Sequence, residues 1–275
     1  MSKDNELTLN NRQIFEAKRL AAETRRLFGV TSNVPIGPDI RLLLENNDVV
    51  LCEYPFPDSQ GTHTYGNITW VKKGEDIITF IGLNTSSYYD EQIFAIAHEI
   101  YHYTTRTGKA YTPDVEHEDE ITEMMADRFA AELLLPADAL LSSSIDVFGS
   151  IDLCDVSPKK MLRFVAGIHC NWWLPYNAII NRLREEEMIG DEQYNYFFNL
   201  DCRSESEAYR RILNSTNREI SELLNKKTKN TGISSKVTDT IINNYEDGLI
   251  DEREFIEALA VLGIKPEDFG YDAEG

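Results

Sequence analysis

The sequence predicts an α+β protein in which a small β-sheet is followed by a helical C-terminal region. Segments rich in β-branched and aromatic residues, which are typical of strands, are evident only between residues 49 and 83. Apolar residues recur at helical spacing on both sides of this stretch. Beyond Pro136 no further strand is evident, so we expect the rest of the chain to be all-α.

The length and composition limit the possible protein classes. The 275 residues suffice for one or two domains, and 42% hydrophobic residues exclude a disordered chain. We expect a metal-site domain at residues 1–145 and a helical region at 146–275 that serves in recognition of a substrate or partner, or as a structural support. The formal net charge of −20 argues against direct binding to nucleic acid or to an anionic membrane, because both require Lys and Arg to neutralise phosphate.

The cysteines and the apolar segments bear on the compartment. The four cysteines form no CxxC pair, so neither a disulfide framework nor a thiolate zinc site is indicated. The N-terminus is polar where a signal peptide would be apolar, and no run of about 18 apolar residues occurs. We therefore expect a cytoplasmic protein that binds no membrane.

Two helices and three strands are predicted in the first third of the chain. Apolar spacing predicts a helix over residues 14–28, which ends at a glycine. A short helix over 39–45 leads into a β-branched strand over 49–52. The segments 65–71 and 77–83 flank a polar Lys-Lys-Gly-Glu-Asp turn and are predicted to form a hairpin.

The remaining predicted elements are all helices. The first begins at an N-cap, Ser87 or Asp90, and fades before Gly108, and the second runs from near Glu120 to Pro136. After these two, apolar periodicity predicts helices over residues 158–169, 175–188, 205–225 and 237–262, with a polar linker at 226–235.

The first of these helices contains His98-Glu99-Ile100-Tyr101-His102, an HExxH sequence. Residues four apart lie nearly above one another on a helix, so both imidazoles can bind one metal ion while Glu99 faces a water molecule beside it. The alternative is a pair of surface histidines beside a solvated glutamate.

The next helix offers a third ligand, which a catalytic zinc ion needs in addition to a water molecule. Glu123 is the candidate, because the intervening loop is long enough to fold this helix back beside the first. Asp127 follows one turn later, where its carboxylate can accept the free ring N–H of a ligating histidine. Alternatively, both residues belong to an exposed acidic face.

Together the two helices resemble the ImmA/IrrE family of metallopeptidases. In that family an HExxH helix is followed by a helix of the form ExxA(N/D)xFAxELLxP, and residues 123–136 here are EMMADRFAAELLLP. The Pro-Asp-Ile at 38–40 and the Ile-Gly-Leu-Asn at 81–84 also fit, so the resemblance covers about residues 35–136. One departure is Ile100-Tyr101, where members often have Leu-Gly or Phe-Gly.

The resemblance implies a zincin-like metallopeptidase core, with His98, His102 and Glu123 on Zn²⁺ and Glu99 as the general base. It also implies an intracellular zinc-dependent endopeptidase that hydrolyses a peptide bond in a protein substrate, namely a helix–turn–helix transcriptional repressor. The acidic charge of the chain is compatible with such a basic, DNA-binding substrate.

Two further parts of this site have only candidates in the sequence. A peptidase of this type needs a donor for the oxyanion, for which His63 and His117 are candidates, although a lone histidine is more often a surface or packing residue. The predicted hairpin offers either an edge strand to which an extended substrate pairs or a structural wall.

The helical C-terminal region contains two further motifs. Residues 156–188 resemble a helix–turn–helix, but Glu185, Glu186 and Glu187 directly follow the cations Arg182 and Arg184, which favours packing on the core over contact with DNA. Residues 247–255 resemble half of an EF-hand loop. Calcium is not expected there, because a tyrosine would occupy the third loop position.

Two other functions stay open on the sequence alone. The chain could be a non-catalytic antirepressor or antitoxin-like interaction protein that retains the metallopeptidase fold, although Glu99 argues against this because a structural metal site needs no base. It could also be a DNA-binding regulator that uses the helical region.

Overall fold

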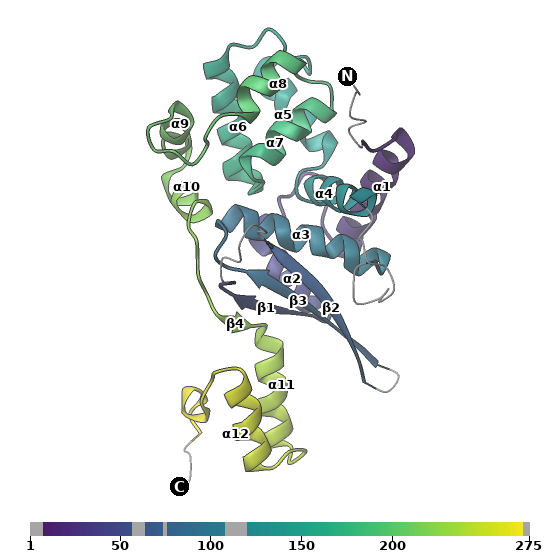
Figure 1. Cartoon of the computed structure of the whole chain (residues 1–275), viewed down its shortest axis with the longest axis vertical. Helices are drawn as coiled ribbons and strands as arrows, with labels where there is room; N and C mark the ends of the chain where they lie inside the picture. The colour runs from purple at the N-terminus through teal and green to yellow at the C-terminus, as the bar shows by residue number, and fades with distance from the viewer. Residues whose placement is uncertain (1–7, 57–63, 74–75, 108–119, 272–275) are drawn as a thin grey trace, which may run out of the picture.

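The structure confirms the α+β class. It is a computed structural model that describes residues 8–56, 64–73, 76–107 and 120–271. Within these residues a four-stranded sheet lies between two groups of helices (Figure 1). None of the helices described combines the length and the apolar character that crossing a bilayer requires.

The sheet has the strand order β2-β3-β1-β4. β1 (Val49–Tyr54) is parallel to β3 (Asp76–Asn84), and β2 (Gly66–Lys73) is antiparallel to β3, which confirms the predicted hairpin. β2 forms one edge of the sheet, and its inward-facing Ile68 is buried. The helix α3 (Tyr89–Thr105) packs against β2 and β3.

The fourth strand contradicts the prediction that no strand follows Pro136. β4 (Gly232–Ile233) lies within the predicted linker and pairs with Cys52 and Glu53 of β1 in antiparallel register. A strand of two residues has no periodicity of its own. Its pairing is decided by the free edge of β1, which no local pattern around residue 232 reveals.

The helices before the metal site follow the prediction closely. α1 (Asn11–Leu27) begins at Asn10, whose side chain accepts hydrogen bonds from the first turn in a capping box. A 3₁₀ turn, η1 (Gly37–Asp39), leads into α2 (Ile40–Asn46), which contacts β1. α4 (Glu120–Leu134) packs against both α1 and α3, so these helices and the sheet share one core.

The helix α5 (Ala137–Phe148) is not in the prediction, which ends one helix at Pro136 and begins the next at residue 158. Pro136 ends α4 and is at the same time the N-cap of α5. The Glu132 carboxylate accepts a hydrogen bond from the Ala137 N–H, which satisfies one of the free donors at the start of the new helix. A proline here separates two helices instead of a helix and a loop.

The C-terminal region contains more and shorter helices than the periodicity predicts. The predicted helix 205–225 is broken at Asn217, whose backbone is extended and whose side chain caps the second half. The predicted helix 237–262 is broken by a turn in which Gly248 has a positive φ of 69°. The observed helices are α6 (Pro158–Trp172), α7 (Tyr176–Glu185), α8 (Asp191–Phe198), α9 (Ala208–Thr216), α10 (Arg218–Leu224), α11 (Ser235–Glu246) and α12 (Glu252–Val261), followed by η2 (Pro266–Phe269).

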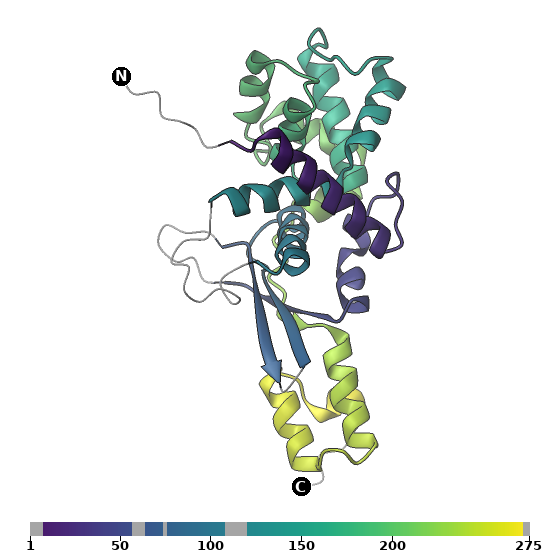
Figure 2. The ribbon, with the colours of Figure 1, turned by 90° about the vertical axis from the view of Figure 1, so that its right-hand side faces the viewer.

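The last two helices form a unit with its own small core. Phe255 is buried between Tyr245, with ring centroids 4.3 Å apart, and Tyr271. These side chains do not belong to the large apolar cluster of the rest of the chain. Figures 1 and 2 show this unit beyond the sheet, at the opposite end of the molecule from α5–α8.

Candidate metal centre

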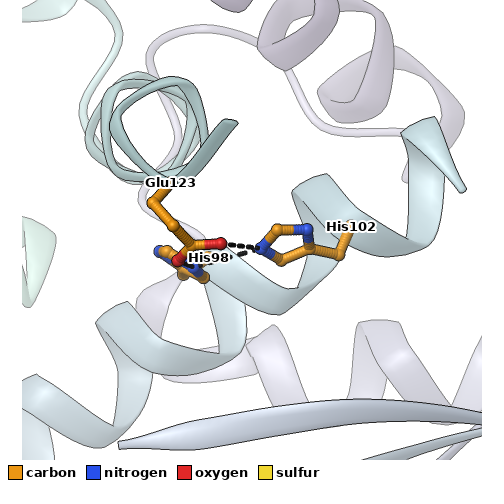
Figure 3. A group of neighbouring side chains, drawn as sticks. All are labelled: His98, His102 and Glu123. Atoms are coloured by element: carbon orange, nitrogen blue, oxygen red, sulfur yellow. Dashed lines mark hydrogen bonds and ion pairs between the residues drawn. The ribbon is translucent and has the colours of Figure 1, made fainter. Parts of the chain in front are cut away.

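The structure brings the three predicted metal ligands together. His98 and His102 lie one turn apart on α3, and Glu123 lies on the first turns of α4 above them (Figure 3). The Nε2 atoms of the two histidines are 3.2 Å apart. The Glu123 carboxylate oxygens lie 3.2 Å from Nε2 of His98 and 3.4 Å from Nε2 of His102. These are the only three described residues that form a group able to hold a metal ion.

These distances fit a tetrahedral zinc site. Ligand atoms that bind zinc at about 2.0–2.1 Å at tetrahedral angles lie roughly 3.3 Å from one another. In addition, Oε1 of Glu123 is buried and makes no well-directed hydrogen bond. Two imidazole nitrogens and a carboxylate that face one another need a positive charge between them, so the donor set fits a divalent cation.

The ring nitrogens that face away from the centre, Nδ1 of each histidine, also have hydrogen-bond partners. Nδ1 of His98 is 2.9 Å from Oδ1 of Asp127, the contact expected from the sequence. Nδ1 of His102 is 3.0 Å from the hydroxyl of Thr107, a partner that the sequence analysis does not include. Partners of this kind fix the tautomer of each ring so that Nε2 is free to bind a metal ion.

The pKa values of His98 and Glu123 in the metal-free site reflect the short distances among these side chains. Burial alone would lower the pKa of His98, but hydrogen bonds to Asp127 and Glu123 raise it to about 10. Interactions with His102 and His98 hold the pKa of Glu123 well below its ordinary value. In the metal-free protein, therefore, a proton on His98 supplies the positive charge that the Glu123 carboxylate requires.

Glu99 belongs to the metal-site helix α3, and its side chain lies between this helix and the edge strand β2. Its side chain is buried, and it faces Gly66 of β2. A Cβ atom placed on Gly66 would be only 3.3 Å from Oε1 of Glu99, so the absence of a side chain at position 66 leaves room for the carboxylate. Glu99 is thus next to the two histidines in sequence and points toward the strand along which a substrate could lie.

A cleft of about 1280 Å³ surrounds these residues. Residues of β2, α3, α4 and α7 line it, together with the segment at the start of α1. The residues that sequence reasoning missed are on α7, where Asn177, Ala178 and Asn181 line the cleft. Only their position on the helix next to α4 reveals them, because the helix–turn–helix resemblance of the surrounding segment does not indicate a place beside the metal site.

The helix α7 packs on the core, as expected from its sequence. Arg182 is completely buried, and its guanidinium lies 2.6 Å from Glu132 of α4 and 2.8 Å from Glu186. Arg184 is paired with Asp191. These pairs occupy both cations on which DNA contact by this helix would depend, which argues against the DNA-binding alternative.

The unusual Tyr101 of the HExxH helix packs beside the metal site. Tyr101, which stands where relatives often have glycine, is buried, and its ring packs against His102 and Phe129. The bulkier side chain therefore belongs to the packing that supports His102. The candidate oxyanion donors His63 and His117 lie outside the described residues.

Comparison with known proteins agrees with this geometry. Residues 44–146 match the model of the family Peptidase_M78, the IrrE N-terminal-like domain. The match covers β1 to β3, the HExxH helix and α4, so it includes every residue of the candidate centre. No curated protein matches the chain. The predicted family resemblance is thereby confirmed for this segment, which is a domain of the metallopeptidase type.

Proposed function

We propose that this chain, whose residues 44–146 belong to the IrrE N-terminal-like family, is a zinc-dependent endopeptidase. The observation that carries the proposal is the convergence of His98, His102 and Glu123 on one point beside the buried carboxylate of Glu99. A structural metal site is closed by a fourth protein ligand, whereas a catalytic site has three and keeps one position for water. Three candidate ligands and an adjacent base favour catalysis.

The proposed chemistry is hydrolysis of a peptide bond. A zinc ion bound there would act as a Lewis acid that polarises the substrate carbonyl and acidifies a water molecule. Glu99 then acts as the general base, accepts the proton of the attacking water and later delivers it to the leaving amine. Asp127 and Thr107 hold Nδ1 of the two imidazoles, so that each Nε2 is directed toward the metal position.

The edge strand β2 supports binding of an extended substrate. Its residues from Gly66 to Thr69 line the cleft, and β3 pairs with only one of its two sides. An extended peptide could add to the other side through main-chain hydrogen bonds, with its scissile bond next to Glu99. The position of β2 therefore favours a substrate-binding role over that of a wall alone.

For the substrate we propose a helix–turn–helix transcriptional repressor in the cytoplasm. This proposal follows the family resemblance, and the net charge of −20 supports attraction to a basic, DNA-binding protein. All four cysteines are free, which fits a reducing compartment.

The first test is the metal content of the purified protein after dialysis against zinc. We expect about one zinc per chain in the wild type, the same in Glu99→Gln, and markedly less in Glu123→Ala. Glu120→Ala is the matched control, because Glu120 is an exposed glutamate on the same helix. Glu99→Gln should at the same time lose hydrolysis of the repressor substrate.

The outcomes separate the candidate functions. Retained cleavage by Glu99→Gln would contradict the role of Glu99 as the base. Absence of zinc from wild type and variants alike would favour the alternative, a non-catalytic antirepressor or antitoxin-like interaction protein on a metallopeptidase fold.

A further inference from the structure

The helix α7 forms a second wall of the cleft, across from the edge strand. Asn177, Asn181 and Glu185 all line the cleft, and they are spaced four residues apart on one face of this helix. The opposite face is buried in the core through Ile179 and Leu183. The orientation of the polar face is therefore decided by the packing of α7.

The ion pairs of Arg182 reinforce this orientation. Because its guanidinium is buried against Glu132 of α4, rotation of α7 about its axis would leave a charged group unpaired in the interior. Glu185, at the last position of the polar face, is paired with Arg128. Asn177 and Asn181 thus remain as two neutral carboxamides that line the cleft.

We propose that the carboxamides of Asn177 and Asn181 bind two successive positions of the substrate main chain. We call this pair of side chains the carboxamide ladder. Positions four residues apart on a helix are separated by a rise of about 6 Å. An extended peptide presents an outward-facing pair of N–H and C=O groups every second residue, at intervals of roughly 6.6 Å. Each carboxamide carries both a donor and an acceptor, so the two side chains match successive main-chain positions of one extended segment.

The surroundings of the two side chains agree with this role. The side-chain oxygen of Asn181 accepts a hydrogen bond of 3.0 Å from the hydroxyl of Tyr194 on α8. This contact holds the carboxamide in place and leaves its N–H groups as donors. Both asparagines are exposed, and neither carboxamide has any other hydrogen bond among the described residues. Ala178, also in the cleft, leaves space beside them for the main chain of the substrate.

The inference rests on the proposed function and adds a second recognition element: α7 binds the main chain of the extended polypeptide substrate. It assigns a binding role to the helical C-terminal region, because α7 lies outside the segment that matches the peptidase family.

The test measures peptide binding to the full-length Glu99→Gln protein, which should not hydrolyse its ligand. A fluorescein-labelled dodecapeptide is first selected from a random-sequence array. Its dissociation constant is then measured for Asn177→Ala/Asn181→Ala in the same background. The matched control is Asn195→Ala/Asn199→Ala, two exposed asparagines four residues apart on and after α8 that do not line the cleft.

We expect the ladder variant to bind the peptide about tenfold more weakly and the control to bind within about twofold of the parent. Asn181→Asp, which keeps the acceptor for Tyr194 but loses the donors, should also bind more weakly. Peptides in which one main-chain N–H is replaced by N-methyl should bind the Glu99→Gln parent more weakly. Where the methylated position is one that contacts Asn177 or Asn181, the methyl group should not weaken binding to the Asn177→Ala/Asn181→Ala variant any further.

Equal binding by parent and ladder variant would overturn the inference, and so would failure of every peptide in the array to bind. The proposed function is judged separately, by the zinc content and hydrolysis of the wild type. An enzyme that binds zinc and hydrolyses its substrate while the ladder variant binds normally would leave the function intact and refute the role of α7.

Discussion

Each histidine of the metal centre is oriented through the ring nitrogen that faces away from the centre. For His98 this partner is a carboxylate, Asp127, and for His102 it is a hydroxyl, Thr107. A carboxylate makes the imidazole more basic and therefore a stronger metal ligand than a hydroxyl does. The two histidines should thus contribute unequally to metal affinity.

Asp127→Asn tests this contribution. The amide can still accept a hydrogen bond but carries no charge, so we expect zinc affinity to fall by about tenfold to a hundredfold. Competition with a chromophoric chelator measures the dissociation constant. Asp146→Asn, on an exposed part of α5, is the control. Equal zinc affinity in both variants would show that Asp127 does not tune His98.

The pKa of His98 predicts how the metal-free protein responds to pH. This pKa is raised to about 10 from an ordinary value of 6.5, so protonated His98 contributes stability fully below about pH 6.5. The contribution is lost as the pH rises through 10. We expect the Tm of the metal-free wild type to fall over this interval, and to fall less in Asp127→Asn. Parallel Tm curves for the two proteins would contradict this prediction.

At the level of elements, the edge strand β2 and the helix α3 approach each other closely at Gly66. A Cβ atom there would also lie 3.3 Å from the carbonyl oxygen of Gly82 on β3, so the added methyl group has rigid backbone on one side and the Glu99 carboxylate on the other. The carboxylate is the part that can move. A glycine at this position therefore keeps the base in place.

Gly66→Ala should reduce hydrolysis by roughly tenfold to a hundredfold, because a small displacement of a catalytic group is costly. Zinc content should stay at one per chain, since the atoms nearest an added Cβ belong to Glu99 and Gly82 and not to a metal ligand. Gly232→Ala is the matched control in a strand, because a Cβ there meets no atom within 4 Å. Loss of zinc in Gly66→Ala would mean that the substitution disturbs the whole centre and not Glu99 alone.

At the level of the whole molecule, the helical region is attached to the metal-site helix through a buried cluster. Asp90, on the first turn of α3, is completely buried and accepts hydrogen bonds of 2.8 and 3.0 Å from Arg203. Nε2 of His169 on α6 lies 3.0 Å from the same carboxylate. Burial would raise the pKa of Asp90, but His169 and Arg203 hold it below its ordinary value, so the stability that this carboxylate contributes is lost as the pH falls into the acid range.

Arg203→Met should therefore destabilise the protein by about 3–5 kcal/mol, because it removes the guanidinium that pairs with the buried Asp90 carboxylate. Urea unfolding monitored by tryptophan fluorescence measures the change. Arg218→Met removes an ion pair whose arginine side chain is 82% exposed and should leave the free energy of unfolding almost unchanged, because water screens the pair. Similar losses in the two variants would show that the buried cluster does not connect the regions.

The sequence by itself determined the parts of this protein that have local or periodic signals. HExxH and the spacing to Glu123 and Asp127 sufficed to select the residues that the structure brings together, because helical geometry converts sequence spacing into direction. The α+β class and the hairpin also followed from local patterns. The ligand roles themselves remain predictions for the zinc measurement.

Only the tertiary structure decided the features that depend on residues far apart in the chain. β4 exists because β1 has a free edge, and Arg182 is buried because α7 packs on α4. The position of α7 beside the cleft is likewise decided only by the tertiary structure. Such contacts depend on which surfaces the core packing brings together, and no spacing along the chain encodes that choice.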